Sequence, residues 1–533
     1  MSAFARPADA TAPTQHFQGR LSLGAALASG FEVLRNTPYQ VTIDASIRSL
    51  PPFDFALVQD GDAIIPVRRG PIASTHRDWE LVLEPGSAWD EPGDGGYSRA
   101  ALPFALMERN ANCLHNGVLT FAFRSDGAIS DVYYQISSET CAYFKFNAWG
   151  LVKARYEPGP VDGGAAIADA YHREVAARLP VQPLSALLNA HPELSAAGFA
   201  LATPADGDPP TVYGVVIDGV NYVGGCDTRT GPYPYCDVLD LPSYSTAKTV
   251  VGAVALMRLE KLWPGARSAL ISDYVPECAT DDWKGVTFEN ALDMTTGVYD
   301  SATFEADENS DATNAFFNAE THAGKIGFAC RHYHRKARPG EKWVYRTSDI
   351  YVLGAAMQAF VRRRLGRDQD FYDALLAGPL WRPERFSPVL MSTLRTEDAV
   401  RQPFVGYGLI YHRDDAARLA GFLAVDEGKV GGTAMLDGAM LRRAMRRDPA
   451  QRGMPAGPGF DYVDGVWARD LAPVLKCASP VWAPFMSGYG GISIVMLPDG
   501  VQYYYFGDSQ VWDWSPAAVE INKIRPICPK AAP

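Results

Sequence analysis

The sequence predicts a mixed α/β (α+β) protein in which a smaller, mostly β domain precedes a larger domain with an antiparallel sheet flanked by helices. With 533 residues, the chain is too long for one ordinary hydrophobic core, so two domains are expected. The first third contains short segments of alternating polarity separated by glycine and proline clusters. The rest of the chain instead alternates helical and strand patterns.

The mostly β domain is predicted over residues 17–157. Segments 39–45, 79–83 and 118–123 alternate polar and apolar residues, which is typical of half-buried strands in an antiparallel sandwich or barrel. This region contains no catalytic motif. One hypothesis for it is therefore the binding of a polymer or glycan.

Residues 158–180 are predicted to link the two domains. They begin with a run rich in proline and glycine and continue as a short helix over 165–178. The larger domain then covers residues 181–533. Its clearest predicted strands and helices are 212–217 and 492–497 as strands, and 353–364 and 414–424 as helices.

The most informative motif is Ser245-Thr246-Ala247-Lys248, which opens an apolar, helix-patterned stretch. A serine hydroxyl near neutral pH becomes a nucleophile only when a base lies within hydrogen-bond reach. A lysine three residues later lies on the same helical face and can be that base if its pKa is lowered by burial or a neighbouring positive group. We therefore predict Ser245 as nucleophile and Lys248 as general base. The alternative is that Ser245 only caps the helix.

A second motif surrounds Tyr345, where a Pro-Gly turn signal leads through an aromatic segment into a helical pattern. We predict Tyr345 as a catalytic residue and Thr347 as a substrate-binding residue, although Tyr345 could instead pack in the core. Arg346, between them, is expected at the surface or in the wall of the site.

A third motif covers residues 485–500. It is typical of a glycine-rich segment that leads into a strand, and another strand is predicted over 501–506. Glycines allow a backbone to come close to a bound ligand. The substrate-binding candidates here are Met486, Ser487 and Gly488.

This order of motifs resembles the serine β-lactamases and penicillin-binding proteins. Within that superfamily of class C type, the sequence resembles the 6-aminohexanoate-dimer (nylon-oligomer) hydrolases most, over roughly residues 180 to 530. The resemblance implies an acyl-enzyme mechanism without a cofactor. It also implies an oxyanion hole formed by the backbone N–H groups of Ser245 and Tyr489, and proton transfer through Tyr345.

Two positions depart from the family pattern. Thr347 stands where class C β-lactamases have asparagine, and Met486 stands where relatives have lysine or histidine. The missing cation removes the usual anchor for the carboxylate of a β-lactam or peptide. We therefore expect poor β-lactam hydrolysis, while neutral amides and esters remain possible substrates.

The predicted function is that of a serine hydrolase that cleaves a carboxylic amide or peptide bond in a small or oligomeric substrate. A carboxylesterase of the same superfamily is a close alternative. A penicillin-binding-like or polymer-binding protein with little turnover is an alternative from a different class.

Charge and hydropathy exclude several other partners. The net charge of −12 disfavours nucleic acids and anionic membranes. No run of about eighteen apolar residues is present, so no membrane span is predicted. The N-terminal residues lack the apolar core of a signal peptide. We expect a periplasmic or secreted protein whose signal peptide has been removed, with a cytoplasmic protein as the alternative.

The eight cysteines favour the oxidising compartment, and pairing of neighbours along the chain is the simplest scheme. It joins Cys113 with Cys141 and Cys226 with Cys236, although eight cysteines allow 105 connectivities. The alternative is eight buried thiols.

His332 and His334 would share one face of a strand, but no further ligand has convincing metal spacing, so no metal site is predicted.

Overall fold

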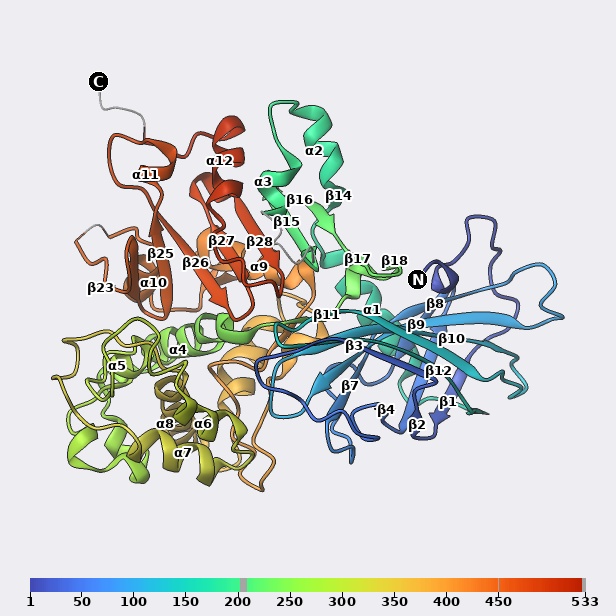
Figure 1. The fold of residues 1–533 in the computed structure, drawn as a ribbon, viewed down its shortest axis with the longest axis horizontal. Coiled ribbons are helices and arrows are strands. Elements are labelled where there is room, and N and C mark those ends of the chain that lie inside the picture. Colours follow the sequence, from blue (N-terminus) through green and yellow to red (C-terminus); the bar gives the residue numbers. More distant parts are fainter. Residues whose placement is uncertain (202–208, 449, 530–533) are drawn as a thin grey trace.

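The computed structural model describes residues 1–201, 209–448 and 450–529. Figure 1 shows a β-rich part formed by the first third of the chain, drawn in blue to cyan, beside a part in which a second sheet and many helices are combined. The predicted mixed α/β class with a mostly β N-terminal region is confirmed.

The β-rich part is one antiparallel sheet of eleven strands in the order β13-β1-β5-β6-β8-β9-β10-β11-β12-β3, with β7 paired to β9. Its strands are β1 (Gln18–Leu23), β3 (Gly30–Asn36), β5 (Phe53–Asp60), β6 (Ala63–Pro66), β7 (Trp79–Leu83), β8 (Gly86–Trp89), β9 (Ser98–Glu108), β10 (Leu114–Phe123), β11 (Val132–Thr140), β12 (Phe144–Val152) and β13 (Ala154–Pro158).

The long hairpin β9–β10 is central to this sheet, because most of its residues are buried on both faces. Its turn, residues 109–113, reaches the second part of the molecule. Helix α1 (Gly164–Ala177) packs against β5 and β6, so the segment predicted as a linker is folded onto the β-rich part.

The second sheet has nine strands in the order β14-β16-β15-β28-β27-β26-β25-β24-β23, antiparallel except for the pair β14–β16. Its strands are β14 (Val181–Pro183), β15 (Val212–Ile217), β16 (Val220–Gly225), β23 (Met454–Pro455), β24 (Phe460–Val463), β25 (Val466–Asp470), β26 (Trp482–Gly488), β27 (Ile492–Met496) and β28 (Gln502–Phe506).

The helices of the second part are α2 (Leu184–Ala190), α3 (Ala196–Ala200), α4 (Val254–Leu262), α5 (Phe288–Leu292), α6 (Asn314–Asn318), α7 (His322–Arg331), α8 (Thr347–Leu365), α9 (Arg413–Ala424), α10 (Gly438–Ala444), α11 (Ala472–Leu475) and α12 (Ser515–Ile524). Some helices pack against this sheet, such as α9 on β27 and β28, whereas α5 to α8 form a separate group below it in Figure 1. The longest, α8, has an acidic residue in its first turn, three arginines in its last turn, and ends at Gly366, where φ is +122°. These features favour a helix because they complement its dipole and allow it to stop.

Three local predictions were wrong. Residues 39–45 form no strand, because the Asn36 side chain bonds both backbone groups of Val41 and Asp44 accepts the N–H of Ser46, so turns replace ladder bonds. The third motif contains a strand from its beginning, since β26 ends only at Gly488. His332 and His334 follow the end of α7 and share no strand face.

All eight cysteines form disulfides between neighbours in the chain, which confirms the simplest pairing scheme. The four bonds join Cys113–Cys141, Cys226–Cys236, Cys278–Cys330 and Cys477–Cys528. Such a set favours an oxidising extracellular compartment. Among the described helices, none is both long and apolar enough to cross a lipid bilayer.

Candidate active site

Ser245 lies in a tight turn that opens a buried helical segment. The turn is the 3₁₀ helix η3 (Tyr244–Thr246), followed by the π-helix η4 (Lys248–Ala253) and α4. In the fully described stretch 241–257, Ser245 alone is not buried. Tyr244, just before it, has a φ of +39°, which is strained for a bulky residue. The Ser245 side chain is therefore accessible, whereas the residues around it in the sequence are buried.

The Lys248 ammonium is the centre of a compact hydrogen-bonded group. Its Nζ lies 2.8 Å from Ser245 Oγ, 2.9 Å from Tyr345 Oη and 2.8 Å from Thr347 Oγ1. The side chain is buried, and burial lowers the pKa of Lys248 to about 8, against an opposing effect of the carboxylates of Glu308 and Glu305. A lysine with this pKa is partly neutral near physiological pH and can accept a proton.

Tyr345 and Thr347 reach Lys248 from the start of α8. Burial raises the pKa of Tyr345 well above its usual value, so this phenol stays protonated at neutral pH. It can therefore donate a proton, whereas Lys248 is the group able to receive one. The structure thus brings together four residues that the sequence predicts for the site, Ser245, Lys248, Tyr345 and Thr347.

Arg346, between those two residues, is not at the surface. Only 1% of it is exposed, its guanidinium pairs with Asp349 and lies 4.3 Å from the centre of the Tyr333 ring. The expectation of a surface or wall residue was wrong, because an acidic residue three positions later on the same helix neutralises the charge in the interior.

Glu308, which sequence reasoning missed, completes the group from the loop before α6. One carboxylate oxygen accepts the backbone N–H of Thr347 at 2.8 Å, and the other accepts its hydroxyl proton. The Thr347 hydroxyl is therefore oriented as a donor to Glu308, which leaves a lone pair for Lys248. No motif marks this loop, and only its run of acidic residues hints at it.

The end of β26 lies against the turn that carries Ser245. A side-chain carbon at Gly488 would be 2.9 Å from the Ser243 carbonyl oxygen, so only glycine fits there without movement. The next residue, Tyr489, packs its ring against Tyr244, with 5.7 Å between ring centres. On the same strand, Met486 is completely buried and Ser487 is partly exposed. The backbone of residues 488–489 thus adjoins the Ser245 turn.

Comparison with known families identifies this region. Residues 241–503 match the profile of the family described as Beta-lactamase. Over this region the chain is similar to the beta-lactamase family. Its members are generally serine hydrolases. No curated protein sequence matches the chain significantly.

Several solved structures resemble the chain at low identity. A protein described as a 6-aminohexanoate-dimer hydrolase from Bacillus anthracis is 15% identical, with a TM-score of 0.45 over 65% of this chain and 87% of its own. A D-stereospecific amidohydrolase from Streptomyces sp. is 13% identical, with a TM-score of 0.42 over 62% and 98%. A class C β-lactamase mutant is 13% identical, with a TM-score of 0.43 over 69% and 100%.

The β-rich part directly supports the turn that carries Ser245. In the β9–β10 turn, Asn112 Oδ1 accepts hydrogen bonds from Ser243 Oγ at 3.1 Å, Tyr244 N at 2.8 Å and Gly408 N at 3.0 Å. The amide nitrogen of Asn112 donates to the Leu409 carbonyl at 3.2 Å. Sequence reasoning missed Asn112, because nothing within its own segment links it to a serine more than a hundred residues away.

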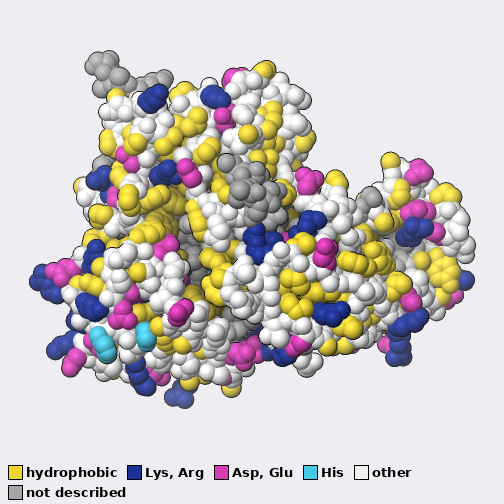
Figure 2. Space-filling view, viewed as in Figure 1, with side chains coloured by type: hydrophobic (Ala, Val, Ile, Leu, Met, Phe, Trp, Pro, Cys, Tyr) yellow, Lys and Arg dark blue, Asp and Glu magenta, His cyan; other side chains and the backbone are white. Residues whose placement is uncertain are grey.

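Aromatic side chains surround Tyr345. Trp467 lies 6.0 Å from the Tyr345 ring and 6.1 Å from that of Phe485, and Trp343 lies 6.1 Å from Tyr345. Phe304, half exposed, stacks on Trp343. Figure 2 shows hydrophobic side chains gathered where the strands of the second sheet meet the helical part.

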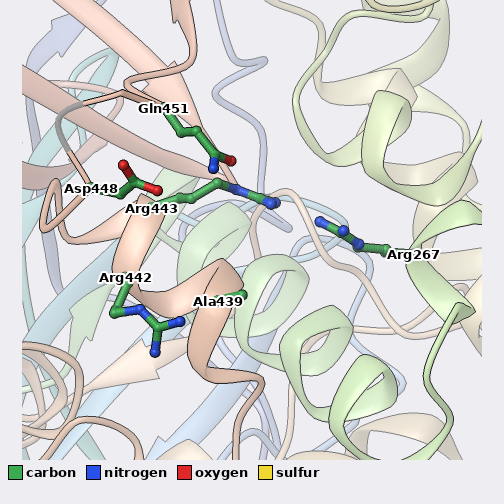
Figure 3. Close-up of a pocket in the computed structure, with 6 residues that line it drawn as sticks. All are labelled: Arg267, Ala439, Arg442, Arg443, Asp448 and Gln451. Atoms are coloured by element: carbon green, nitrogen blue, oxygen red, sulfur yellow. The ribbon is translucent and has the colours of Figure 1, made fainter.

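A separate surface pocket of about 270 Å³ lies beside α10 (Figure 3). It is lined by Arg267, Ala439, Arg442, Arg443, Asp448 and Gln451. Arg443 is paired with Asp464 and Glu289, and Arg267 with Glu289. This pocket shares no lining residue with the group around Lys248.

Proposed function

We propose that the protein is a serine hydrolase that cleaves a carboxylic amide or peptide bond in a small or oligomeric substrate through an acyl-enzyme at Ser245. The observation that carries this proposal is the position of Lys248 Nζ, within 2.9 Å of the oxygens of Ser245, Tyr345 and Thr347. One buried base thus contacts a partly exposed nucleophile and a protonated phenol.

In the first step, neutral Lys248 takes the Ser245 proton as Oγ attacks the substrate carbonyl carbon. The negative charge that develops on the carbonyl oxygen is stabilised by the backbone N–H groups of Ser245 and Tyr489, the proposed oxyanion hole. Each such donor typically lowers the barrier by about 3 kcal/mol. Ser487 and Gly488 border this position on β26, and Thr347 borders it beside Lys248.

In the second step, the carbon–nitrogen bond breaks and the amine leaves with a proton. An amine is a poor leaving group unless it is protonated, and Tyr345 is placed to supply that proton from Lys248. This need for a proton donor supports an amide substrate over an ester. Water then attacks the acyl-enzyme with the same groups in reverse, which releases the acid and restores Ser245.

The charges near Lys248 support a substrate without a carboxylate at this end of the site. Met486, at the position where relatives have a cation, is uncharged and completely buried. Arg346 is buried and its charge is already paired with Asp349. Glu305 and Glu308 add negative charge beside Lys248. A substrate carboxylate would be repelled here rather than paired, which disfavours β-lactams.

Substrate profiling tests the proposal. Aminohexanoate oligomers, small peptides, nitrophenyl esters and nitrocefin are compared under one set of conditions. We expect the highest kcat/KM on a neutral linear amide and the lowest on nitrocefin. Turnover of esters alone would replace the proposal by a carboxylesterase. A burst of one product equivalent without further turnover would indicate a penicillin-binding-like protein.

The four disulfides support a periplasmic or secreted location for this activity. Fractionation of the source cells tests the location directly.

A further inference from the structure

Three polar side chains from distant parts of the chain meet in the interior behind the Ser245 turn. Glu84 joins β7 to β8, Asp240 directly precedes β19 (Leu241–Pro242), and His412 directly follows β20 (Ile410–Tyr411) and caps α9. Strands β19 and β20 are antiparallel, with Leu241 opposite Tyr411. The next residues outward, Asp240 and His412, therefore come to lie opposite each other. All three residues are at most 1% exposed.

The spacing of their polar atoms is that of ligands around one ion. His412 Nε2 lies 3.6 Å from Glu84 Oε2 and 3.7 Å from Asp240 Oδ1, and one ligand atom from each residue lies within 4.8 Å of the others. These distances are too long for hydrogen bonds. Two ligands bound to the same tetrahedral zinc ion, with bonds of about 2.0–2.2 Å, are about 3.4 Å apart.

Each of the three side chains also carries a buried polar atom that has no partner among the described residues; in Glu84 this atom is Oε1, because Oε2 accepts hydrogen bonds from Arg69. Within the described part of the chain, His412 Nε2, Asp240 Oδ1 and Glu84 Oε1 are buried without a hydrogen bond. Buried polar atoms are nearly always paired, because an unpaired one has lost its water without compensation. Three such atoms on side chains that face one another point to a shared ligand.

The surrounding charges leave room for a cation. Arg69 pairs with Glu84 at 2.7 Å and also with Glu174, and Arg178 pairs with Glu174 at 2.8 Å. Arg413, which is paired with Asp237, also acts on His412, and Asp415 acts on Asp240. Three guanidinium groups therefore stand beside five carboxylates, counting Asp240. A divalent ion would complete this set, and one imidazole with two carboxylates is a donor set that zinc accepts.

We propose that Glu84, Asp240 and His412 form a structural binding site for one divalent transition-metal ion, with zinc as the best match. The ion ties the β7–β8 connection of the β-rich part to the strand that leads into Ser245 and to the start of α9. Arg69 holds Glu84 Oε2 and orients that ligand from the outer shell. The proposal is independent of the acyl-enzyme chemistry.

The test measures metal content and needs no activity assay. Untagged protein is produced in media supplemented with zinc, cobalt or manganese, purified without chelators, and analysed for metals. We expect about one ion per chain in the wild type and a visible absorption band in the cobalt form. His412→Gln and Asp240→Asn should each retain at least about tenfold less metal. Glu84→Gln replaces either variant that does not fold.

His115 provides the matched control. It is also completely buried with both ring nitrogens unpaired, but it stacks on Phe146 at 4.4 Å among aromatic rings. His115→Gln should therefore keep the ion, whereas His412→Gln loses it. Wild-type protein with less than about 0.1 ion per chain in all three media overturns the proposal, as does equal metal content in the wild type and in the His412 and Asp240 variants.

Discussion

Replacing Glu308 with glutamine tests how the proposed lysine base is tuned. The two hydrogen bonds from Lys248 to Thr347 and from Thr347 to Glu308 place the ammonium within about 5 Å of the carboxylate. At that separation two unit charges interact by about 1 kcal/mol in water and about 3 kcal/mol at an effective dielectric constant of 20. Because Glu308 is partly exposed, the lower end applies, which corresponds to about one pKa unit.

The sign follows from the role of Lys248 as a base. Its pKa lies at about 8, and only its neutral form accepts the serine proton, so kcat/KM should rise as the pH rises through about 8. The Glu308 carboxylate opposes the burial effect and raises this pKa. Glu308→Gln should therefore move the acidic limb of the profile about one pH unit lower. It should also lower the plateau, because glutamine cannot hold both groups of Thr347 in the same way.

Glu305→Gln is the matched control, since Glu305 also raises the pKa of Lys248 but has no hydrogen bond to Thr347. We expect a shift of the limb in the same direction with the plateau unchanged. The assay is the initial rate on the best amide substrate between about pH 6 and 10, a range that brackets the pKa of Lys248. A Glu308→Gln profile that superimposes on the wild type would refute the assignment of Lys248 as the titrating base.

Four further substitutions, one of them a control, and one substrate comparison test the rest of the site. Lys248→Ala should lower kcat by about 10³-fold or more, and Tyr345→Phe by somewhat less, because it keeps the ring and removes only the proton-carrying oxygen. An unchanged pH profile in Tyr345→Phe would make Tyr345 a packing residue. Asn112→Ala leaves buried donors of the Ser245 turn unpaired, at about 1–3 kcal/mol each, and should lower both the melting temperature and kcat. Asn110→Ala, in the same turn, should spare kcat. Because Met486 provides no cation, nitrocefin should be hydrolysed orders of magnitude more slowly than the best amide or ester, and equal rates would contradict this reading of the third motif.

The residues around Lys248 could be predicted because local patterns encode them. Ser245 and Lys248 are three positions apart at a helix start, and Tyr345 and Thr347 stand at the start of the next long helix. Each motif has its own helix or strand signal, and the order of the motifs links them to a known family. Neighbour pairing of the cysteines was only the simplest of many schemes, because separations of up to 52 residues provide no local signal.

Residues that act across the tertiary structure could not be predicted. Glu308 and Asn112 contact the site from loops without periodicity, and their roles depend on which segments the fold places beside Lys248 and Ser243. Arg346 was misassigned because an arginine is usually solvated, and its burial depends on Asp349. Residues 39–45 were predicted as a strand from their alternating pattern. Side-chain hydrogen bonds to the backbone stabilise turns there instead.

The contacts of Asn112 also change how the β-rich part should be studied. Removing the first 165 residues to ask whether this part binds a polymer would take away the partner of Ser243 and Tyr244. The expected result is loss of activity for a structural reason. Substitutions on the far strands of the sheet, such as the exposed Leu151 and Trp149 of β12, test polymer binding without disturbing the catalytic turn.

Covalent labelling of Ser245 tests the central claim most directly. Purified protein is treated with a fluorophosphonate, and the modified peptide is located by intact mass and peptide mapping. The proposed mechanism predicts one adduct per chain, on Ser245, with loss of activity in proportion to labelling and no adduct in Ser245→Ala. An adduct on another residue, or a Ser245→Ala protein that still turns over substrate, would contradict it.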